Sequence, residues 1–218
     1  MYITLFLICK QKFYKQIKIF LFTIKNYCVI SNLDFKLRGL KMLQITRNKS
    51  DGYDFYVTPK WVTNILCQEE KFEGNIWECA CGDGAICEAL IDNGYLNITA
   101  SDIKDYNYTP ASFGKDFLKE TNKCINIVTN PPYHLALKFM KKCEELATKK
   151  YALLLPIRYM TGKKRIDFYC NIRAPKKIIP IAQKIDFGGG AWYEFAWYIF
   201  DKDYQGKTEI VWKEVNVK

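Results

Sequence analysis

Short apolar runs alternate with amphipathic segments along most of the chain. The apolar runs that predict buried strands lie at residues 76–80, 98–101, 124–129 and 151–156. Apolar residues recur at helical spacing before the first of these runs, at residues 61–67, and between later ones, at 86–93 and 135–147, which predicts three helices. Strands that alternate with helices in this way are typical of an α/β domain with a parallel, doubly wound sheet.

Two further apolar runs, at residues 195–200 and 209–212, follow a basic segment at 158–186 that shows no clear periodicity. The turn between the two runs spans only residues 201–206. Because strands joined so closely usually pair antiparallel, we expect the domain to end in an antiparallel hairpin.

The first 41 residues differ from the rest in charge. They contain eight basic residues and one acidic residue, so they hold +7 of the formal net charge of +10 and leave +3 for residues 42–218. An excess of only three positive charges in residues 42–218 is weak support for a nucleic-acid partner. The longest charge-free run of this segment, residues 1–9, is too short to span a bilayer.

Three interpretations of residues 1–41 stay open. The segment is a helix that docks on the domain, a basic amphipathic segment at a membrane surface, or sequence upstream of a start at Met42. We favour a helical, catalytically dispensable extension at 1–41, followed by a single domain at 42–218, over contact with a membrane.

The cysteine pattern bears on metals and on the redox compartment. The chain has nine cysteines, one histidine (His134) and no Cys-x-x-Cys pair. An odd count argues against a disulfide framework, and Cys79 and Cys81 lack the second ligand pair that a zinc site needs. We therefore expect no bound metal, and we expect the cytoplasm or another reducing intracellular compartment.

The first candidate site is a glycine-rich turn, Glu-Cys-Ala-Cys-Gly-Asp-Gly at residues 78–84, between a predicted strand and a predicted helix. Glycine lets the backbone approach a ligand closely, and Asp102, at the end of the next strand, can accept hydrogen bonds from both ribose hydroxyls. This pairing favours a nucleoside cofactor over two ordinary turns. The turn lacks the third glycine of a dinucleotide site and the lysine of a P-loop, whereas the acid Glu78 suits the cationic, amino-bearing S-adenosylmethionine.

The second candidate site is Asn130-Pro131-Pro132-Tyr133, between a predicted strand and a predicted helix. An exocyclic amino group on an aromatic ring is a poor nucleophile because its lone pair is conjugated. The side-chain carbonyl of Asn130 and the backbone carbonyl of Pro131 can each accept a hydrogen bond from the amino group. These two bonds localise the lone pair on the nitrogen. Tyr133 offers a flat face on which an extruded base can stack. A plain proline turn after a strand is the alternative.

With these motifs, residues 53–213 resemble the class I S-adenosylmethionine-dependent methyltransferases. The Asn-Pro-Pro-Tyr sequence is similar to the [Asp/Asn/Ser]-Pro-Pro-[Tyr/Phe/Trp] motif of amino-methyltransferases. Residues 195–201 (FAWYIFD) resemble the final hairpin strand of small phage and prophage N6-adenine DNA methyltransferases. The resemblance implies an α/β fold: a seven-stranded, mostly parallel Rossmann-like sheet with helices on both faces and a C-terminal antiparallel hairpin. It also implies S-adenosylmethionine as the cofactor and adenine N6 in DNA as the acceptor.

The resemblance also assigns roles to single residues. Asn130, Pro131, Pro132 and Tyr133 would form the catalytic loop, and Asp116 would bind the amino group of the cofactor's adenine. Cys79 stands where the family often has proline. The full set implied to contact the cofactor is Tyr56, Thr58, Pro59, Glu78, Cys79, Ala80, Gly82, Gly84, Asp102, Ile103, Asp116, Phe117 and Asn130.

The acceptor is less well specified than the cofactor. No large target-recognition domain is evident after Tyr133, so contacts with nucleic acid would come from loops. Lys163, Lys164 and Arg165 are the candidates for binding phosphates, although a solvated charged surface explains them equally well. The rival acceptors are adenine in RNA and glutamine in proteins, but glutamine enzymes usually carry an N-terminal recognition domain larger than forty residues. A binding module that has lost catalysis is a further alternative.

Overall fold

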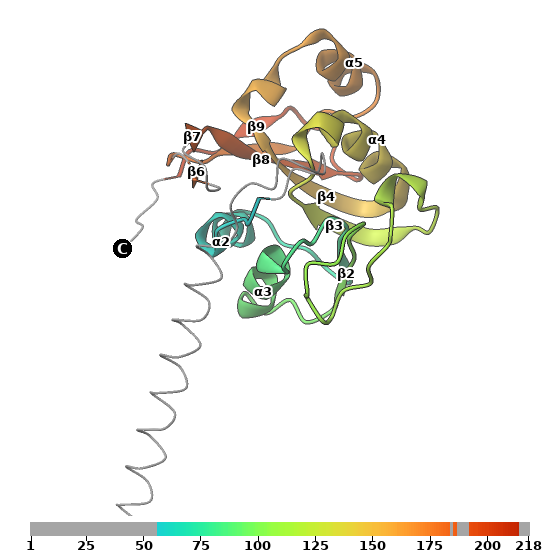
Figure 1. Cartoon of the computed structure of the whole chain (residues 1–218). Coiled ribbons are helices and arrows are strands. Elements are labelled where there is room, and N and C mark those ends of the chain that lie inside the picture. Colours follow the sequence, from blue (N-terminus) through green and yellow to red (C-terminus); the bar gives the residue numbers. More distant parts are fainter. Residues whose placement is uncertain (1–55, 184, 187–191, 214–218) are drawn as a thin grey trace, which may run out of the picture. The chain divides into compact units, whose positions relative to one another are not determined.

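A seven-stranded sheet forms the centre of the molecule in the computed structural model, which describes residues 56–183, 185–186 and 192–213 (Figure 1). The strands lie in the order β2-β1-β3-β4-β8-β5-β9. Their bounds are β2 Ile98–Ala100, β1 Ile76–Glu78, β3 Cys124–Thr129, β4 Ala147–Pro156, β8 Phe195–Asp201, β5 Lys177–Pro180 and β9 Glu209–Ile210. Only β8 runs against its neighbours, β4 and β5, within this sheet. The predicted α/β fold with a seven-stranded, mostly parallel sheet is therefore confirmed. The predicted extension at residues 1–41 lies outside the described residues.

The end of the domain differs in one pairing from the sequence-based prediction. We expected the strands now seen as β8 and β9 to pair directly, but β9 pairs in parallel with β5, which lies between them. The physical reason is that β8 has no free edge, because it is hydrogen-bonded to β4 over its whole length and to β5 on the other side. A two-stranded antiparallel sheet, β6 (Ile185–Asp186) with β7 (Trp192–Tyr193), precedes β8 instead.

Helices cover both faces of the sheet, as predicted. Figure 1 shows α2 (Lys60–Glu69) and α3 (Ala85–Asp92) on one side, and α4 (Ala136–Leu146) and α5 (Lys163–Asn171) on the other. Successive residues of a strand point to opposite faces of the sheet. Their buried side chains therefore belong alternately to two cores, one on each face. The α2 and α3 core contains Val62, Leu66, Leu90, Val128, Leu154 and Trp197. The α4 and α5 core contains Phe139, Met140, Ile127, Leu153, Phe168 and Phe200.

The basic segment after β4 is more ordered than its sequence indicates. It begins with the 3-10 helix η3 (Ile157–Met160) and continues into α5. Its amphipathic signal is weak, but Phe168 is buried and packs edge-on against Phe200 at a ring-centroid distance of 6.2 Å. Tyr169, the next residue of α5, also lies against Phe200, at a ring-centroid distance of 6.3 Å. These aromatic contacts hold α5 on the sheet, and they depend on tertiary structure that the local sequence does not reveal.

Two further observations concern membranes and metals. In the described part of the chain, no helix combines the length and apolar character needed to cross a membrane. Within the same residues, no group of three or more His, Cys, Asp or Glu side chains could hold a metal ion. The cysteines that can be described, seven in number, are all free thiols.

Candidate active site at the carboxyl ends of the strands

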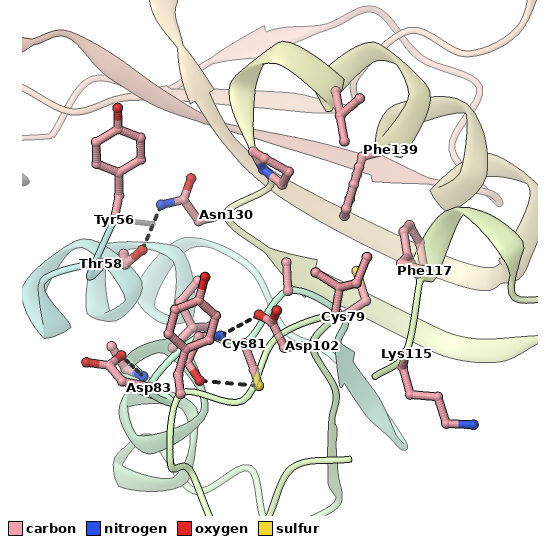
Figure 2. A pocket seen from close by; sticks show the side chains of 18 of the residues that line it. Tyr56, Thr58, Cys79, Cys81, Asp83, Asp102, Lys115, Phe117, Asn130 and Phe139 are labelled. Atoms are coloured by element: carbon pink, nitrogen blue, oxygen red, sulfur yellow. Dashed lines mark hydrogen bonds between the residues drawn. The ribbon is translucent and has the colours of Figure 1, made fainter. Parts of the chain in front are cut away.

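A cavity opens where β1, β2 and β3 end (Figure 2). The cavity has a volume of about 100 Å³ and is partly open to solvent. The ends of parallel strands are the usual ligand site of doubly wound sheets. The residues predicted from sequence that line it are Tyr56, Thr58, Cys79, Ala80, Gly82, Asp102, Ile103, Asp116, Phe117, Asn130 and Pro132. Folding therefore brings both candidate sites of the sequence to one cavity.

The glycine-rich turn folds tightly between β1 and α3. Gly82 and Gly84 adopt φ values of 53° and 85°, which side chains with a Cβ rarely tolerate. A Cβ on Gly84 would lie 2.4 Å from the ring of Tyr108. Gly84 does not line the cavity, so its role is to let Tyr108 pack over the turn and fix its shape.

Asp102 is held in place by the same turn. Its Oδ2 accepts a hydrogen bond from the backbone N–H of Gly82 at 2.8 Å (Figure 2). Its Oδ1 accepts one from the backbone N–H of Lys104 at 3.0 Å. Burial raises the pKa of Asp102, while these two hydrogen bonds oppose the rise. Each carboxylate oxygen can accept more than one hydrogen bond. The carboxylate can therefore also accept the hydroxyls of a ribose in the cavity.

Asn130 lies at the opposite side of the cavity, just after β3. Its Nδ2 donates a hydrogen bond to Oγ1 of Thr58 at 3.0 Å. Its Oδ1 is buried and has no hydrogen-bond partner among the described residues. A buried acceptor without a partner is costly, so this oxygen is suited to receive an N–H group from a ligand.

Tyr133 packs among aromatic rings next to the cavity. Its ring is stacked on that of Tyr56, with a centroid distance of 5.4 Å and an interplanar angle of 17°. It also lies 5.3 Å from the ring of Phe195, tilted by 42°. A base that stacks on Tyr133 therefore has to share this aromatic cluster with Tyr56, and the stacking role of Tyr133 stays a prediction.

Several predicted site residues do not line the cavity. Besides Gly84 and Tyr133, these are Pro59, which caps the start of α2, Glu78, which is fully buried, and Pro131, which is buried in the catalytic loop.

Sequence comparisons find no match, whereas structural comparisons find solved structures with a similar fold. A scan against models of protein families finds no match, and a search of curated proteins finds no similar sequence. Among solved structures, a modification subunit of a putative type I restriction enzyme from Vibrio vulnificus YJ016 has a TM-score of 0.59 at 12% identity, over 84% of this chain and 51% of that chain. A putative class I S-adenosylmethionine-dependent methyltransferase from Listeria monocytogenes has a TM-score of 0.59 at 13% identity, over 81% of this chain and 71% of that chain. This chain has the fold of the class I methyltransferases.

Other neighbours share this methyltransferase fold. A putative RNA methyltransferase from Pyrococcus horikoshii has a TM-score of 0.56 at 13% identity, over 75% of this chain and 96% of that chain. The chain spans only about half the length of the restriction-system proteins that it matches, for example 51% of the Vibrio protein and 48% of one from Streptococcus thermophilus. At such identities the likeness concerns the fold.

Glu78 supports the glycine turn of this methyltransferase fold from beneath. Its Oε1 accepts a hydrogen bond from the backbone N–H of Ala80 at 3.0 Å. Burial raises its pKa from 4.5 to about 8, despite the opposing hydrogen bond from Ala80. Glu78 is therefore protonated in the folded protein at neutral pH.

This protonation predicts a pH dependence of stability. Between pH 4.5 and about 8 the folded protein holds a proton on Glu78 that the unfolded chain has lost. The free energy of unfolding should fall as pH rises through this window, by up to about 1.4 kcal/mol per pH unit. In denaturant titrations, Glu78→Gln should flatten the curve between pH 5 and 8 relative to wild type. Parallel curves for the two proteins would contradict the assigned protonation.

The predicted phosphate-binding residues lie on α5, outside the cavity. Lys163 and Lys164 are exposed in its first turn. Arg165 is already engaged: its guanidinium lies 4.5 Å from the centroid of the Tyr159 ring, and its Nε donates to the carbonyl of Thr161. No contact described here tests whether these side chains bind phosphate.

Tyr159 connects this region to the catalytic loop. Its hydroxyl donates a hydrogen bond to the backbone carbonyl of Tyr133 at 2.8 Å. Tyr159→Phe should lower the turnover number about three- to tenfold, because one neutral hydrogen bond that positions the loop is lost. The affinity for S-adenosylhomocysteine, measured by isothermal titration calorimetry, should stay within about twofold of wild type. A twofold change is roughly the smallest effect that the loss of one hydrogen bond has.

A matched control exists for this change. The hydroxyl of Tyr204 also donates to a backbone carbonyl, that of Lys207 at 2.8 Å, but in a turn that contributes nothing to the cavity lining. Tyr204→Phe should leave turnover unchanged. Equal turnover losses in the two variants would show that Tyr159 has no special role.

Sequence reasoning missed nine residues that line the cavity. They are Cys81, Asp83, Ala85, Ile86, Tyr106, Lys115, Leu118, Leu135 and Phe139. Some were within reach, because Cys81 and Asp83 belong to the glycine turn itself. Leu135 and Phe139 stand four residues apart at helical spacing, which is the signal of an ordinary core helix. Tyr106 lies in a loop without periodicity, so no sequence signal marks it.

Proposed function

We propose that this protein transfers a methyl group from S-adenosylmethionine to an exocyclic amino group, and that the acceptor is N6 of adenine in DNA. The observation that carries the proposal is Oδ1 of Asn130, which is buried and has no hydrogen-bond partner among the residues that the structure describes. It lies in the cavity that is also lined by Asp102 and the glycine turn. An acceptor for an N–H group and a candidate ribose site thus share one enclosed space. That arrangement suits a nucleoside cofactor beside an amino substrate.

The residues present fit the cofactor. Asp102 would accept the ribose hydroxyls, and Gly82 provides close backbone approach. Asp116 and Phe117 would hold the adenine, and Thr58 would face the methionine end. When bound, S-adenosylmethionine supplies an electrophilic methyl group on a sulfonium centre.

The catalytic loop would make the acceptor nitrogen reactive. Asn130 Oδ1 and the carbonyl of Pro131 would accept the two amino hydrogens and draw the nitrogen out of conjugation. The nitrogen held by these two oxygens would form an N–C bond to the methyl group as the bond from that methyl group to sulfur breaks, and its surplus proton would pass to solvent. Positioning of the two groups supplies most of the rate enhancement, and no strong general base is required.

The choice of DNA rests on two supports. Solved structures with similar folds include modification subunits of type I restriction systems, which points to a DNA acceptor for those proteins. The exposed Lys163 and Lys164 could neutralise phosphates. The neighbour described as a putative RNA methyltransferase makes RNA the second candidate.

A transfer assay with tritiated S-adenosylmethionine tests the proposal. The full chain is incubated with DNA, with RNA and with a protein extract, and the labelled product is digested and identified by mass spectrometry. We expect label in DNA, recovered as N6-methyldeoxyadenosine. Label found only in RNA, or only on glutamine, would show that DNA is not the acceptor. No label in any fraction would contradict the proposed methyl transfer.

A further inference from the structure

We propose that the hydroxyl of Thr58 couples the cofactor site to the acceptor site by fixing the side-chain amide of Asn130. In this arrangement the hydroxyl accepts a hydrogen bond from Asn130 and donates its own proton to the carboxylate at the methionine end of the cofactor. This inference rests on the proposed function and adds to it. It makes Thr58 a positioning residue for the catalytic loop as well as a cofactor contact.

The contact joins two parts of the chain that are far apart in sequence. Thr58 precedes α2, Asn130 follows β3, and Nδ2 of Asn130 lies 3.0 Å from Oγ1 of Thr58 (Figure 2). Thr58 is only 3% exposed, and both residues line the same cavity. Solvent therefore competes little for this hydrogen bond.

Local structure fixes the Thr58 hydroxyl before any ligand binds. Threonine is restricted at χ1, and a residue before proline is restricted in its backbone. Pro59 caps α2, and its carbonyl accepts from the N–H of Val62 at 2.9 Å. The carbonyl of Val62 in turn accepts from Nε1 of Trp197 at 2.8 Å, which ties α2 to β8 in the core.

The chemistry of an amide explains why this bond matters. The terminal torsion of asparagine is broad and roughly two-fold, so an unrestrained amide can exchange its NH2 and oxygen ends. With NH2 bonded to Thr58, the oxygen is left as the free end, and it is the buried oxygen without a partner among the described residues. The reversed amide would present a donor to an amino group that is itself a donor.

The same bond leaves the Thr58 proton available. A hydroxyl has a single proton to donate, and Oγ1 acts as the acceptor toward Asn130. The proton can therefore point to an anionic group in the cavity. Linked hydrogen bonds polarise one another, so a bound carboxylate should strengthen the hold on Asn130.

The first test compares Thr58→Val with Thr58→Ser. Valine keeps the shape but removes the hydroxyl, and serine keeps the hydroxyl. At saturating cofactor and DNA, Thr58→Val should lower the turnover number about 10- to 100-fold, whereas Thr58→Ser should stay within about threefold of wild type. If saturating cofactor fully restores turnover in Thr58→Val, Thr58 only binds the cofactor and does not position Asn130. That result would overturn the coupling.

Thr63 provides the matched control. It is fully buried in α2, and its hydroxyl has no hydrogen-bond partner in the part of the chain that the structure describes. Thr63→Val removes a buried hydroxyl from the same helix region without touching the cavity, so turnover should not change. A loss equal to that of Thr58→Val would mean that the effect comes from general packing.

A second test needs no turnover. In Asn130→Asp the carboxylate would accept the hydrogen bond that the Thr58 hydroxyl otherwise donates to the cofactor, so the affinity for S-adenosylhomocysteine, measured by calorimetry, should fall. The fall should be at least about threefold smaller in the Thr58→Val background, because coupled residues are non-additive. Additive effects would overturn the coupling. This cycle stands apart from the proposed function, which fails only if the wild-type chain transfers no methyl group.

Discussion

Asn130→Ala is expected to lower the turnover number for methyl transfer about 10²- to 10³-fold, which is the usual loss when one preorganised polar group at the reacting centre is removed. The reason is that Oδ1 of Asn130 is a buried acceptor in the cavity, without a partner among the described residues. Without it the acceptor nitrogen keeps its conjugated, planar form. Affinity for S-adenosylhomocysteine should fall by less than about fivefold, since only the indirect link through one neutral hydrogen bond is lost.

An exposed asparagine serves as the control for this change. Asn122 lies in the loop before β3 and does not line the cavity of the candidate active site. Asn122→Ala should keep wild-type turnover and affinity. If Asn130→Ala turns over as fast as wild type, Asn130 and its loop do not have the catalytic role assigned to them.

Asp102→Ala should weaken the binding of S-adenosylhomocysteine at least about 100-fold, because hydrogen bonds from two ribose hydroxyls to a charged group are lost together. The carboxylate also accepts from the N–H groups of Gly82 and Lys104, at 2.8 and 3.0 Å. Loss of these bonds loosens the glycine turn and should cost about 1–3 kcal/mol of stability. Calorimetry measures the affinity, and denaturant titration measures the stability.

Asp105 allows a matched control in the same loop. It is exposed, its Oδ1 accepts from the N–H of Asn107 at 2.7 Å, and it does not line the cavity. Asp105→Ala should bind S-adenosylhomocysteine as wild type does. If Asp102→Ala binds equally well, the ribose does not lie at Asp102 and the orientation of the cofactor has to be revised.

Much of the fold could be predicted because local patterns of apolar and polar residues determine its strands and helices. The runs that form β1 to β4 are apolar, and helical periodicity separates β1 from β2 and β3 from β4, so the existence of these strands and the parallel sheet follow from the sequence. The glycine turn and Asp102 were recognisable because parallel strands bring their carboxyl ends to one edge. Asn130 could be placed in the same cavity for the same reason.

Other features depend on tertiary contacts that no local pattern encodes. The pairing of β9 with β5 follows from β8 being bonded on both edges. The stack of Tyr56 on Tyr133 joins residues 77 positions apart, by the numbers of the two rings. The bond between Thr58 and Asn130 likewise needed coordinates, although each residue had been assigned to the site from sequence.

The most direct measurement is a crystal structure of the full chain with S-adenosylhomocysteine and an adenine-containing DNA duplex. The account predicts an extruded adenine whose N6 lies about 3 Å from Oδ1 of Asn130, with the ribose of the cofactor at Asp102. An adenine that stays stacked in the duplex while the cofactor is bound, or an Asn130 amide whose NH2 end faces the base, would contradict it.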